Sequence, residues 1–180
     1  MVTRALLTLI AVLATGSAAA DENDRDSVTL SRSELSLCGE ATLRAFAIVH
    51  VGTSRLFLED CQQTGLPLEP PLLLESTYSR ALPARAFREP GETILQRNLD
   101  EEEWEALRES VEAFQQHYRD VEDGDRYALH YHSDGTLVLT LNDEPLARET
   151  GHDFAQAYLR IWFGERPFSR RLRDALLASD

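Results

Sequence analysis

The fold is decided by residues 118–177, which read YRDVEDGDRYALHYHSDGTLVLTLNDEPLARETGHDFAQAYLRIWFGERPFSRRLRDALL. Tyr127, Leu129 and Tyr131 alternate along one strand, the chain turns at Ser-Asp-Gly (residues 133–135), and a second strand runs back through residues 137–141. A helix that ends at Gly164 follows. This order predicts a β-hairpin whose sheet is covered by a helix. The stretch contains no evident set of catalytic groups, so it indicates the fold more than the function.

The helices around this hairpin are predicted from their caps and apolar faces. The strongest helix is expected over residues 101–118, where Asp100 and Glu103 form a capping-box pattern. Thr150, answered by Asp153, is expected to cap the helix after the hairpin, and Ser169 a last short helix. The apolar stripe of the strongest helix is read as core, although a ligand-cleft wall would show the same spacing: Trp104, Leu107, Val111, Phe114 and Tyr118.

Upstream of residue 100 the pattern favours strands. Leu35 and Leu37 alternate in a short strand, residues 42–58 read as one long or two short strands, and residues 72–78 as the next. A further strand is expected around residues 145–150. Pro83 is predicted to open a short helix that ends at Pro90. The chain is therefore an α+β protein with one domain over residues 34–180, preceded by a flexible charged segment at residues 21–33.

Residues 1–20 resemble a signal peptide. Arg4 gives a positive start, a short apolar run follows, and Ala18, Ala19 and Ala20 form a cleavage pattern, so cleavage is expected after about Ala20. An uncleaved N-terminal anchor is the alternative. The apolar run is too short to span a bilayer comfortably, and no later segment reaches the roughly 20 residues that a span needs. We expect an exported protein, which in a bacterium means the periplasm.

The composition limits the chemistry. Without residues 1–20, 17 basic residues face 31 acidic ones, which gives a net charge of −14. Every basic residue is arginine, so lysine-based catalysis is excluded. The acidic excess argues against nucleic acid and anionic membrane surfaces as partners. Cys38 and Cys61 are expected to form a disulfide in an oxidising compartment, the alternative being two buried free thiols.

Metal and cofactor sites are not expected. His130 and His132 share a strand face and are predicted to face solvent, with no third ligand in view. His152 and Asp153 lie side by side at a helix start, where capping explains them better than a catalytic pair. The chain contains no nucleophile-elbow, dinucleotide-binding or P-loop motif.

Three segments carry a resemblance to a known family: GDRYALHY, DGTLVLTLND and GHDFAQAYLRIWFGERP. They resemble the C-terminal pattern of bacterial exported chalcone isomerase-like proteins, and GEATLRAFAIVHVGTSRLFLED and LLLESTYSRAL fit the upstream part more loosely. The resemblance implies an open-faced β-sandwich, in which a large antiparallel sheet is covered by helices on one face. In this superfamily, plant chalcone isomerases close a flavanone ring, and their plant relatives bind fatty acids in the cleft between the sheet and the helices.

The resemblance also implies where a ligand would bind. Arg44 best matches the arginine that contacts the anionic end of the ligand, although a surface strand arginine would look the same. Gly52 occupies the place of a tyrosine or threonine of the family, so His50 and Thr53 are candidate substitutes. Tyr78 is a further candidate for a cleft hydroxyl. The catalytic constellation of the true isomerases is not recognisable here.

Three hypotheses follow. The leading one is a non-catalytic periplasmic protein that binds a small apolar ligand with an anionic end, such as a fatty acid, without a cofactor. Arg44 would pair with its head group, and the sheet and the Trp104 helix would enclose its tail. The second is a cofactor-free isomerase or lyase that uses Arg44 and a nearby hydroxyl as electrophiles. The third is an interaction module of the cell envelope with a solid core.

Overall fold

A computed structural model of the protein describes residues 29–45, 48–63 and 66–178. The predicted signal peptide and residues 21–28 of the predicted flexible segment lie outside this part. The described strands are β1 (Ser36–Ala45), β2 (Val49–Leu58), β3 (Leu72–Tyr78), β4 (Arg126–Tyr131), β5 (Leu137–Leu141) and β6 (Glu144–Glu149). The described helices are α2 (Arg85–Gln96), α3 (Glu101–Gln115), α4 (His152–Phe163) and α5 (Arg170–Leu176).

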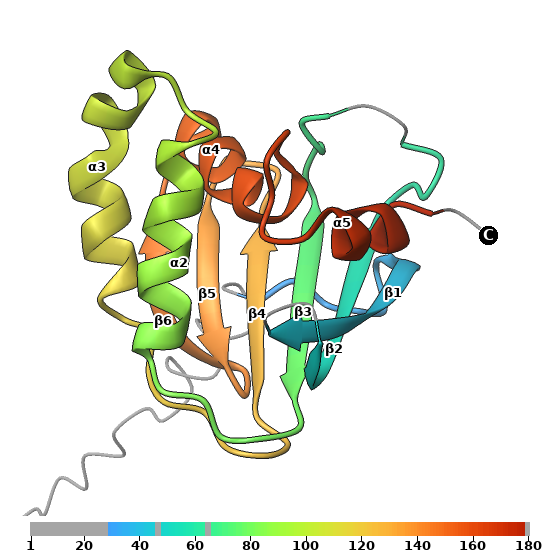
Figure 1. The fold of residues 1–180 in the computed structure, drawn as a ribbon. Helices are drawn as coiled ribbons and strands as arrows, with labels where there is room; N and C mark the ends of the chain where they lie inside the picture. The colour runs from blue at the N-terminus through green and yellow to red at the C-terminus, as the bar shows by residue number, and fades with distance from the viewer. Residues whose placement is uncertain (1–28, 46–47, 64–65, 179–180) are drawn as a thin grey trace, which may run out of the picture.

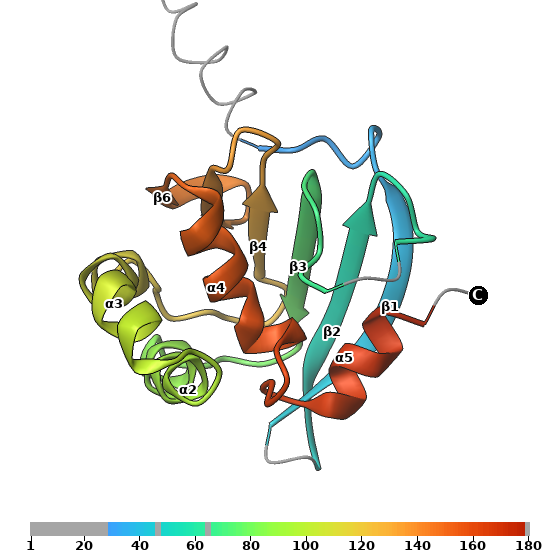
Figure 2. The same ribbon diagram turned by 90° about the horizontal axis from the view of Figure 1, so that it is seen from above.

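The six strands form one antiparallel sheet in which the order in space is the order in the chain. Residues 42–58 form parts of two strands rather than one long strand, because the chain turns back between β1 and β2. Helices α2, α3 and α4 lie together on one side of the sheet (Figures 1 and 2). The sequence-based prediction of an α+β open-faced sandwich, with an antiparallel sheet covered by helices on one face, is confirmed.

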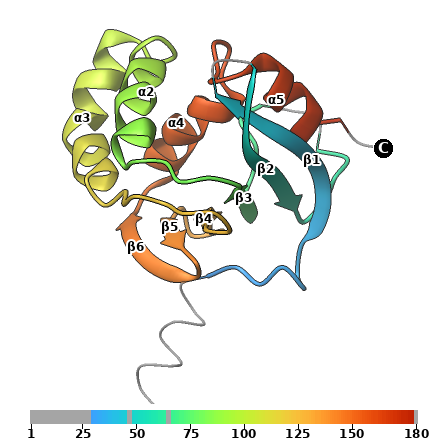
Figure 3. The same cartoon turned by 60° about the horizontal axis from the view of Figure 1, so that its bottom comes forward.

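The main core lies between the sheet and these helices. The inner face of the sheet contributes residues such as Leu56, Leu74 and Leu129, which pair across neighbouring strands with their side chains toward the helices. Seen from below, the β1 end of the sheet curves up to meet α5 (Figure 3). Gly39 permits this contact, because a Cβ at this position would overlap the backbone of Leu176 in α5.

The caps confirm part of the helix predictions and correct the rest. Asp100 and Glu103 form a complete capping box at the start of α3, and Ser169 caps α5. Thr150 does not cap α4, whose N-cap is Gly151 with no side-chain hydrogen bond. The side chain of His152 does not serve as a cap either, because its Nδ1 lies 2.7 Å from the hydroxyl of Tyr131.

Two helix ends also differ from the prediction. Helix α3 ends at Gln115, so Tyr118 follows the helix instead of closing it. Helix α2 does not end at Pro90 but contains it and continues to Gln96. Proline removes one hydrogen bond from the helix, yet Ile94 and Leu95 lie beyond it and are buried in the core. Packing of this last part of the helix therefore outweighs the local preference.

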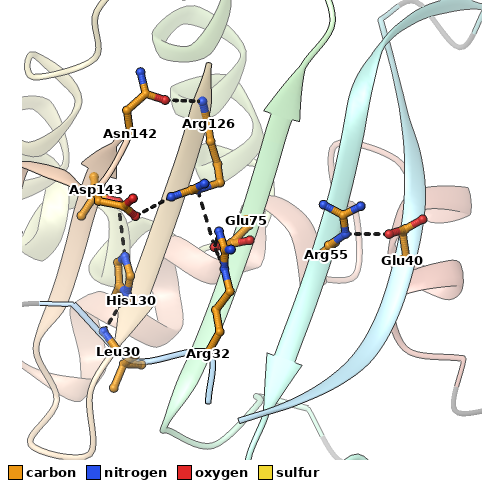
Figure 4. Close-up of polar contacts among 10 residues, drawn as sticks. Leu30, Arg32, Glu40, Arg55, Glu75, Arg126, His130, Asn142 and Asp143 are labelled. Carbon is orange, nitrogen blue, oxygen red and sulfur yellow. Dashed lines mark hydrogen bonds and ion pairs between the residues drawn. The ribbon is translucent and has the colours of Figure 1, made fainter. Parts of the chain in front are cut away.

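The outer face of the sheet is partly covered by residues 29–35, which we call the N-terminal strap. The amide of Leu30 donates to Nδ1 of His130 at 2.9 Å, and Arg32 binds the buried Glu75 at 2.6 Å (Figure 4). The prediction that His130 faces solvent is therefore wrong, since its side chain is only 3% exposed. Strand alternation placed it correctly on the outer face, but could not show that another segment covers that face.

The strap also encloses a small second apolar cluster. Leu35 packs on Phe57, Leu73 and Ala128, which all lie on the outer face. Near this end of the sheet, Cys38 of β1 and Cys61, which follows β2, form the expected disulfide. The disulfide closes a loop of 23 residues in sequence separation around the β1–β2 hairpin. Both features join the N-terminal part of the domain to the sheet.

Candidate ligand-binding cavity

A cavity of about 530 Å³ lies between the inner face of the sheet and helices α2 and α4. Its volume falls within the range of about 300–1,000 Å³ that is common for small-molecule sites. The lining is mainly apolar and aromatic. Strands β1 to β5 supply the floor, including Leu43, Val51, Leu74, Leu129 and Leu139, and the helices supply the roof, including Phe87, Ile94, Ile161 and Trp162.

A bulge between Leu43 and Arg44 shapes the floor at the β1–β2 edge. The register shift there leaves Val51 as an extra residue in β2, since Leu43 pairs with Gly52 and Arg44 pairs with His50. Leu43 and Val51 are both buried and both line the cavity. The bulge thus brings two apolar side chains from neighbouring strands to the same wall.

The roof depends on a close approach of α2 to its neighbouring helices. A Cβ at Gly91 would lie 2.8 Å from Nε2 of Gln115 in α3 and 3.6 Å from Cδ1 of Ile161 in α4. Glycine therefore lets α2 pack tightly beside both helices, while Phe87 and Ile94 of the same helix line the cavity. Gly91 therefore holds α2 against its neighbouring helices, and these helices together cover the cavity.

Four tyrosines supply most of the uncharged polar groups of the lining, together with Ser76. The hydroxyl of Tyr127 donates to the carbonyl of Arg119 at 2.8 Å and accepts from its amide at 2.7 Å. Tyr158 donates to the hydroxyl of Tyr118 at 3.3 Å. Tyr78 is the fourth, and it packs edge-on against Phe87 and Tyr127. Three of the four hydroxyls thus have a protein partner at these distances.

Burial keeps these phenols protonated. It raises the pKa of Tyr118, Tyr127 and Tyr158 above the usual value for a phenol. Burial also raises the pKa of Tyr78, and the neighbouring Tyr127 raises it further, while a hydrogen bond with Ser76 lowers it in part. At neutral pH the lining therefore offers neutral hydroxyl groups and no phenolate.

Charge is confined to two lining residues on α2. Arg85 is its first residue, and Glu89 follows one turn later. Arg85 is exposed, and its side chain makes no hydrogen bond or ion pair with any other described residue. Phe168, in the loop between α4 and α5, also lines the cavity and is 39% exposed. These residues mark the mouth, where a guanidinium group is available to an anionic ligand group.

The structure brings only one of the four predicted ligand-binding residues to the cavity. Tyr78 lines it, whereas Arg44, His50 and Thr53 are not among its lining residues. Arg44 pairs with His50 on the outer face of the β1–β2 hairpin, and its Nη1 lies 3.4 Å from the carbonyl of Ile48. The side chain of His50 lies 3.3 Å from the hydroxyl of Ser79. The structure therefore does not bring these three residues to the cavity, and their role in binding stays a prediction.

Thr53 lies on the outer face as well, paired with Thr42 on one side and Thr77 on the other. Helix α3 does not form the roof, since neither Trp104 nor Leu107 lines the cavity. Helix α2 takes that place, and sequence reasoning missed it because Pro90 was read as its end. The signal that was available is the spacing of Phe87, Gly91 and Ile94, which recur on one helical face.

Within the described ranges, no group of three histidine, cysteine, aspartate or glutamate side chains is placed to hold a metal ion. None of the four described helices is both long and apolar enough to cross a membrane.

These features define an apolar cavity under helices on an antiparallel sheet, and comparison with known proteins gives the class. The sequence profile of the chalcone isomerase-like family matches residues 17–178. The chain therefore belongs to the chalcone isomerase-like family. Among solved structures it is similar to the crystal structure of a fatty-acid binding protein of Arabidopsis thaliana, at 14% identity and a TM-score of 0.53. That match covers 83% of this chain and 89% of the other, and it supports the fold. A search of the curated proteins found no match.

Proposed function

We propose that the chain is a non-catalytic binding protein for a small apolar ligand with an anionic end, such as a fatty acid. The observation that carries the proposal is the apolar cavity of about 530 Å³ with the unpaired Arg85 at its mouth. Its fold is shared with a structure described as a fatty-acid binding protein, which supports the same ligand class. The tail would lie between the sheet and α2, and the head group would meet Arg85.

The apolar lining supplies the affinity in this proposal. Burial of each methylene group of a ligand contributes about 0.8 kcal/mol. A charge-assisted hydrogen bond from Arg85 adds about 1.5–3 kcal/mol and fixes the direction in which the ligand enters. Ser76 and Tyr78 lie deeper in the lining and offer hydroxyl groups to a polar substituent on the tail. Most of the binding free energy would then come from the tail, and the selection of an acid from Arg85.

Binding is favoured over turnover by the chemistry of the lining. It contains no histidine and no cysteine, and its one carboxylate, Glu89, stands on α2 beside Arg85. The four phenols have raised pKa values, so they donate hydrogen bonds but do not accept protons at neutral pH. The isomerase hypothesis relies on Arg44 as an electrophile, and Arg44 does not line this cavity. We therefore place the isomerase hypothesis second.

We also propose that the protein acts after export, in the periplasm of a bacterium. Support comes from the signal-like residues 1–20 and from the disulfide between Cys38 and Cys61, which is a feature of proteins in oxidising compartments. Accurate mass determination of the mature protein from a bacterial host tests this proposal. A mass that begins at Asp21 supports it, and a retained N-terminus refutes it.

Displacement of a fluorescent fatty acid by palmitate and by the uncharged hexadecanol tests the ligand class and its orientation. Arg85→Gln should weaken palmitate binding about tenfold to a hundredfold and leave hexadecanol binding unchanged. Arg88→Gln is the matched control, because Arg88 is exposed on the same helix and does not line the cavity.

Arg44→Gln in the same assay tests the assignment made from the family resemblance. Loss of palmitate binding in Arg44→Gln, with Arg85→Gln unaffected, would transfer the head-group site to Arg44. If the wild-type protein binds neither ligand, and native mass spectrometry of the purified protein shows no lipid, the binding proposal is refuted.

A further inference from the structure

Positive charge is concentrated on one segment of this acidic protein. Residues 160–173 contain five arginines and a single acidic residue, Glu165, whereas the whole chain has 18 basic and 31 acidic residues. Arg160 is paired with Glu103, and Arg173 with Asp174. The other three, Arg166, Arg170 and Arg171, are exposed and make no side-chain hydrogen bond or ion pair with the described part of the chain.

The loop that carries Arg166 and leads into α5, residues 164–169, is held in place by side chains that follow the end of α2. The amide of Arg166 donates to Oδ1 of Asn98 at 2.8 Å, and its carbonyl accepts from Nδ2 of Asn98 at 2.8 Å. Arg97 donates to the carbonyls of Arg166 and Pro167 at 2.7 and 2.6 Å. The amide of Phe168 donates to the carbonyl of Ile161 at 2.7 Å. The loop is therefore a fixed platform.

This platform presents an aromatic ring beside the cavity mouth. Phe168 is 39% exposed although its backbone is anchored, and its side chain lines the cavity together with Arg85 and Trp162. The loop runs between the end of α4 and α5, next to α2 (Figures 1 and 2). An exposed aromatic residue among unpaired arginines is the composition with which proteins contact an anionic lipid surface.

We propose that residues 166–171 dock the protein on an anionic lipid bilayer, so that the mouth of the cavity faces the membrane and the ligand passes between bilayer and cavity. The inference rests on the proposed function for its purpose, since an apolar ligand that leaves a bilayer directly never has to cross water. The three unpaired arginines meet the lipid phosphates, and Phe168 enters the boundary between head groups and acyl chains.

The negative net charge of the chain argues against binding to an anionic surface, but docking depends on how the charges are distributed over the protein. At physiological ionic strength the Debye length is about 8 Å, so charges on the far side of the domain are largely screened. Of the acidic groups near the mouth, Glu89 and Glu165 are exposed and oppose docking, while Asp174 is paired with Arg173. The acidic remainder of the surface repels the bilayer in every other orientation. The charge asymmetry therefore favours one orientation.

Co-sedimentation with vesicles tests the proposal. Wild-type protein should bind vesicles of equimolar phosphatidylcholine and phosphatidylglycerol, bind pure phosphatidylcholine weakly, and lose binding at high salt. The triple variant R166Q/R170Q/R171Q should weaken partition on the order of 100-fold, because each arginine near an anionic surface contributes about a fivefold factor. Its affinity for a fluorescent fatty acid in solution should not change.

The control is R108Q/R119Q/R148Q, which removes the same charge from α3, the loop after it and β6, at the opposite edge of the sheet from α5 (Figure 1). It should bind vesicles like the wild type. Equal loss in both triple variants, or no vesicle binding by a wild type that does bind fatty acid, overturns the docking proposal and leaves the binding function standing. If the wild type binds vesicles but binds no fatty acid, the binding function is refuted and the docking proposal stands.

Discussion

The clearest test of the cavity is the same substitution at two buried valines. Val51 is 4% exposed and lines the cavity, whereas Val111 is 1% exposed on α3 and does not line it. In a packed core, tryptophan in place of valine forces neighbours apart, which costs about 1–3 kcal/mol or more. Facing a cavity of about 530 Å³, the indole enters space that no protein atom occupies. Val111→Trp should therefore be destabilising, and Val51→Trp close to neutral.

The two substitutions should differ measurably in their effect on Tm. For a domain of this size, 1 kcal/mol shifts Tm by about 2–4 °C, so Val111→Trp should lower Tm by several degrees and Val51→Trp should hold it within about 2 °C. Ligand binding should respond in the opposite sense. If the indole displaces about four methylene groups of a bound tail, at about 0.8 kcal/mol each, the Kd of palmitate rises on the order of 100-fold in Val51→Trp. Val111→Trp should bind normally below its Tm.

The assays are thermal unfolding followed by circular dichroism and displacement of a fluorescent fatty acid. Equal destabilisation of both variants would refute the reasoning, because it would mean that Val51 already packs against a filled core. Unchanged palmitate affinity in Val51→Trp would show that the ligand binds elsewhere.

Two further predictions concern the outer face. Burial lowers the pKa of His130 to about 4 in the folded state, from about 6.5 in the unfolded chain. As pH falls from about 6.5 to 4, the unfolded state gains this proton first, so the protein should lose about 3 kcal/mol of stability. His130→Asn should flatten that part of the stability–pH curve, measured by urea unfolding. Arg32→Ala should lower the stability by about 1–2 kcal/mol, because it removes an ion-pair partner from the buried carboxylate of Glu75 (Figure 4). Arg55→Ala breaks an exposed pair with Glu40 and should lower the stability by less than about 1 kcal/mol. Equal urea midpoints for the two arginine variants would contradict this.

The fold was predictable because its signals are local. The turn at residues 133–135, the Asp100 capping box and the Ser169 cap each act within a few residues, and the meander pairs strands that follow one another in the chain. The alternation of Tyr127, Leu129 and Tyr131 then identified the inner face correctly. Local chemistry and strand order together were sufficient for the architecture.

The site was less predictable than the fold, because it depends on which face of the sheet each strand residue points to. Alternation in β1 places Leu43 toward the helices and Arg44 on the outer face, whereas Val51 faces the cavity only because it is the extra residue of a bulge in β2, and a shift of one residue moves every side chain to the other face. Arg85 was missed because no local signal shows that the start of α2 lies over the sheet and lines the cavity. The burial of His130 was missed because the covering strap is 100 residues away in sequence. Each failure involves contacts between distant parts of the chain.

The strand order has a consequence for how the domain assembles. Every strand pairs with its neighbour in sequence, so most of the sheet forms without a long search for a partner. The contacts that close the longest loops belong to the two ends of the domain, where Leu30 reaches His130 and α5 reaches β1. We expect the meander to form early and both ends to close last, on opposite faces of the sheet. A nascent chain would then complete its domain only after α5 has been synthesised.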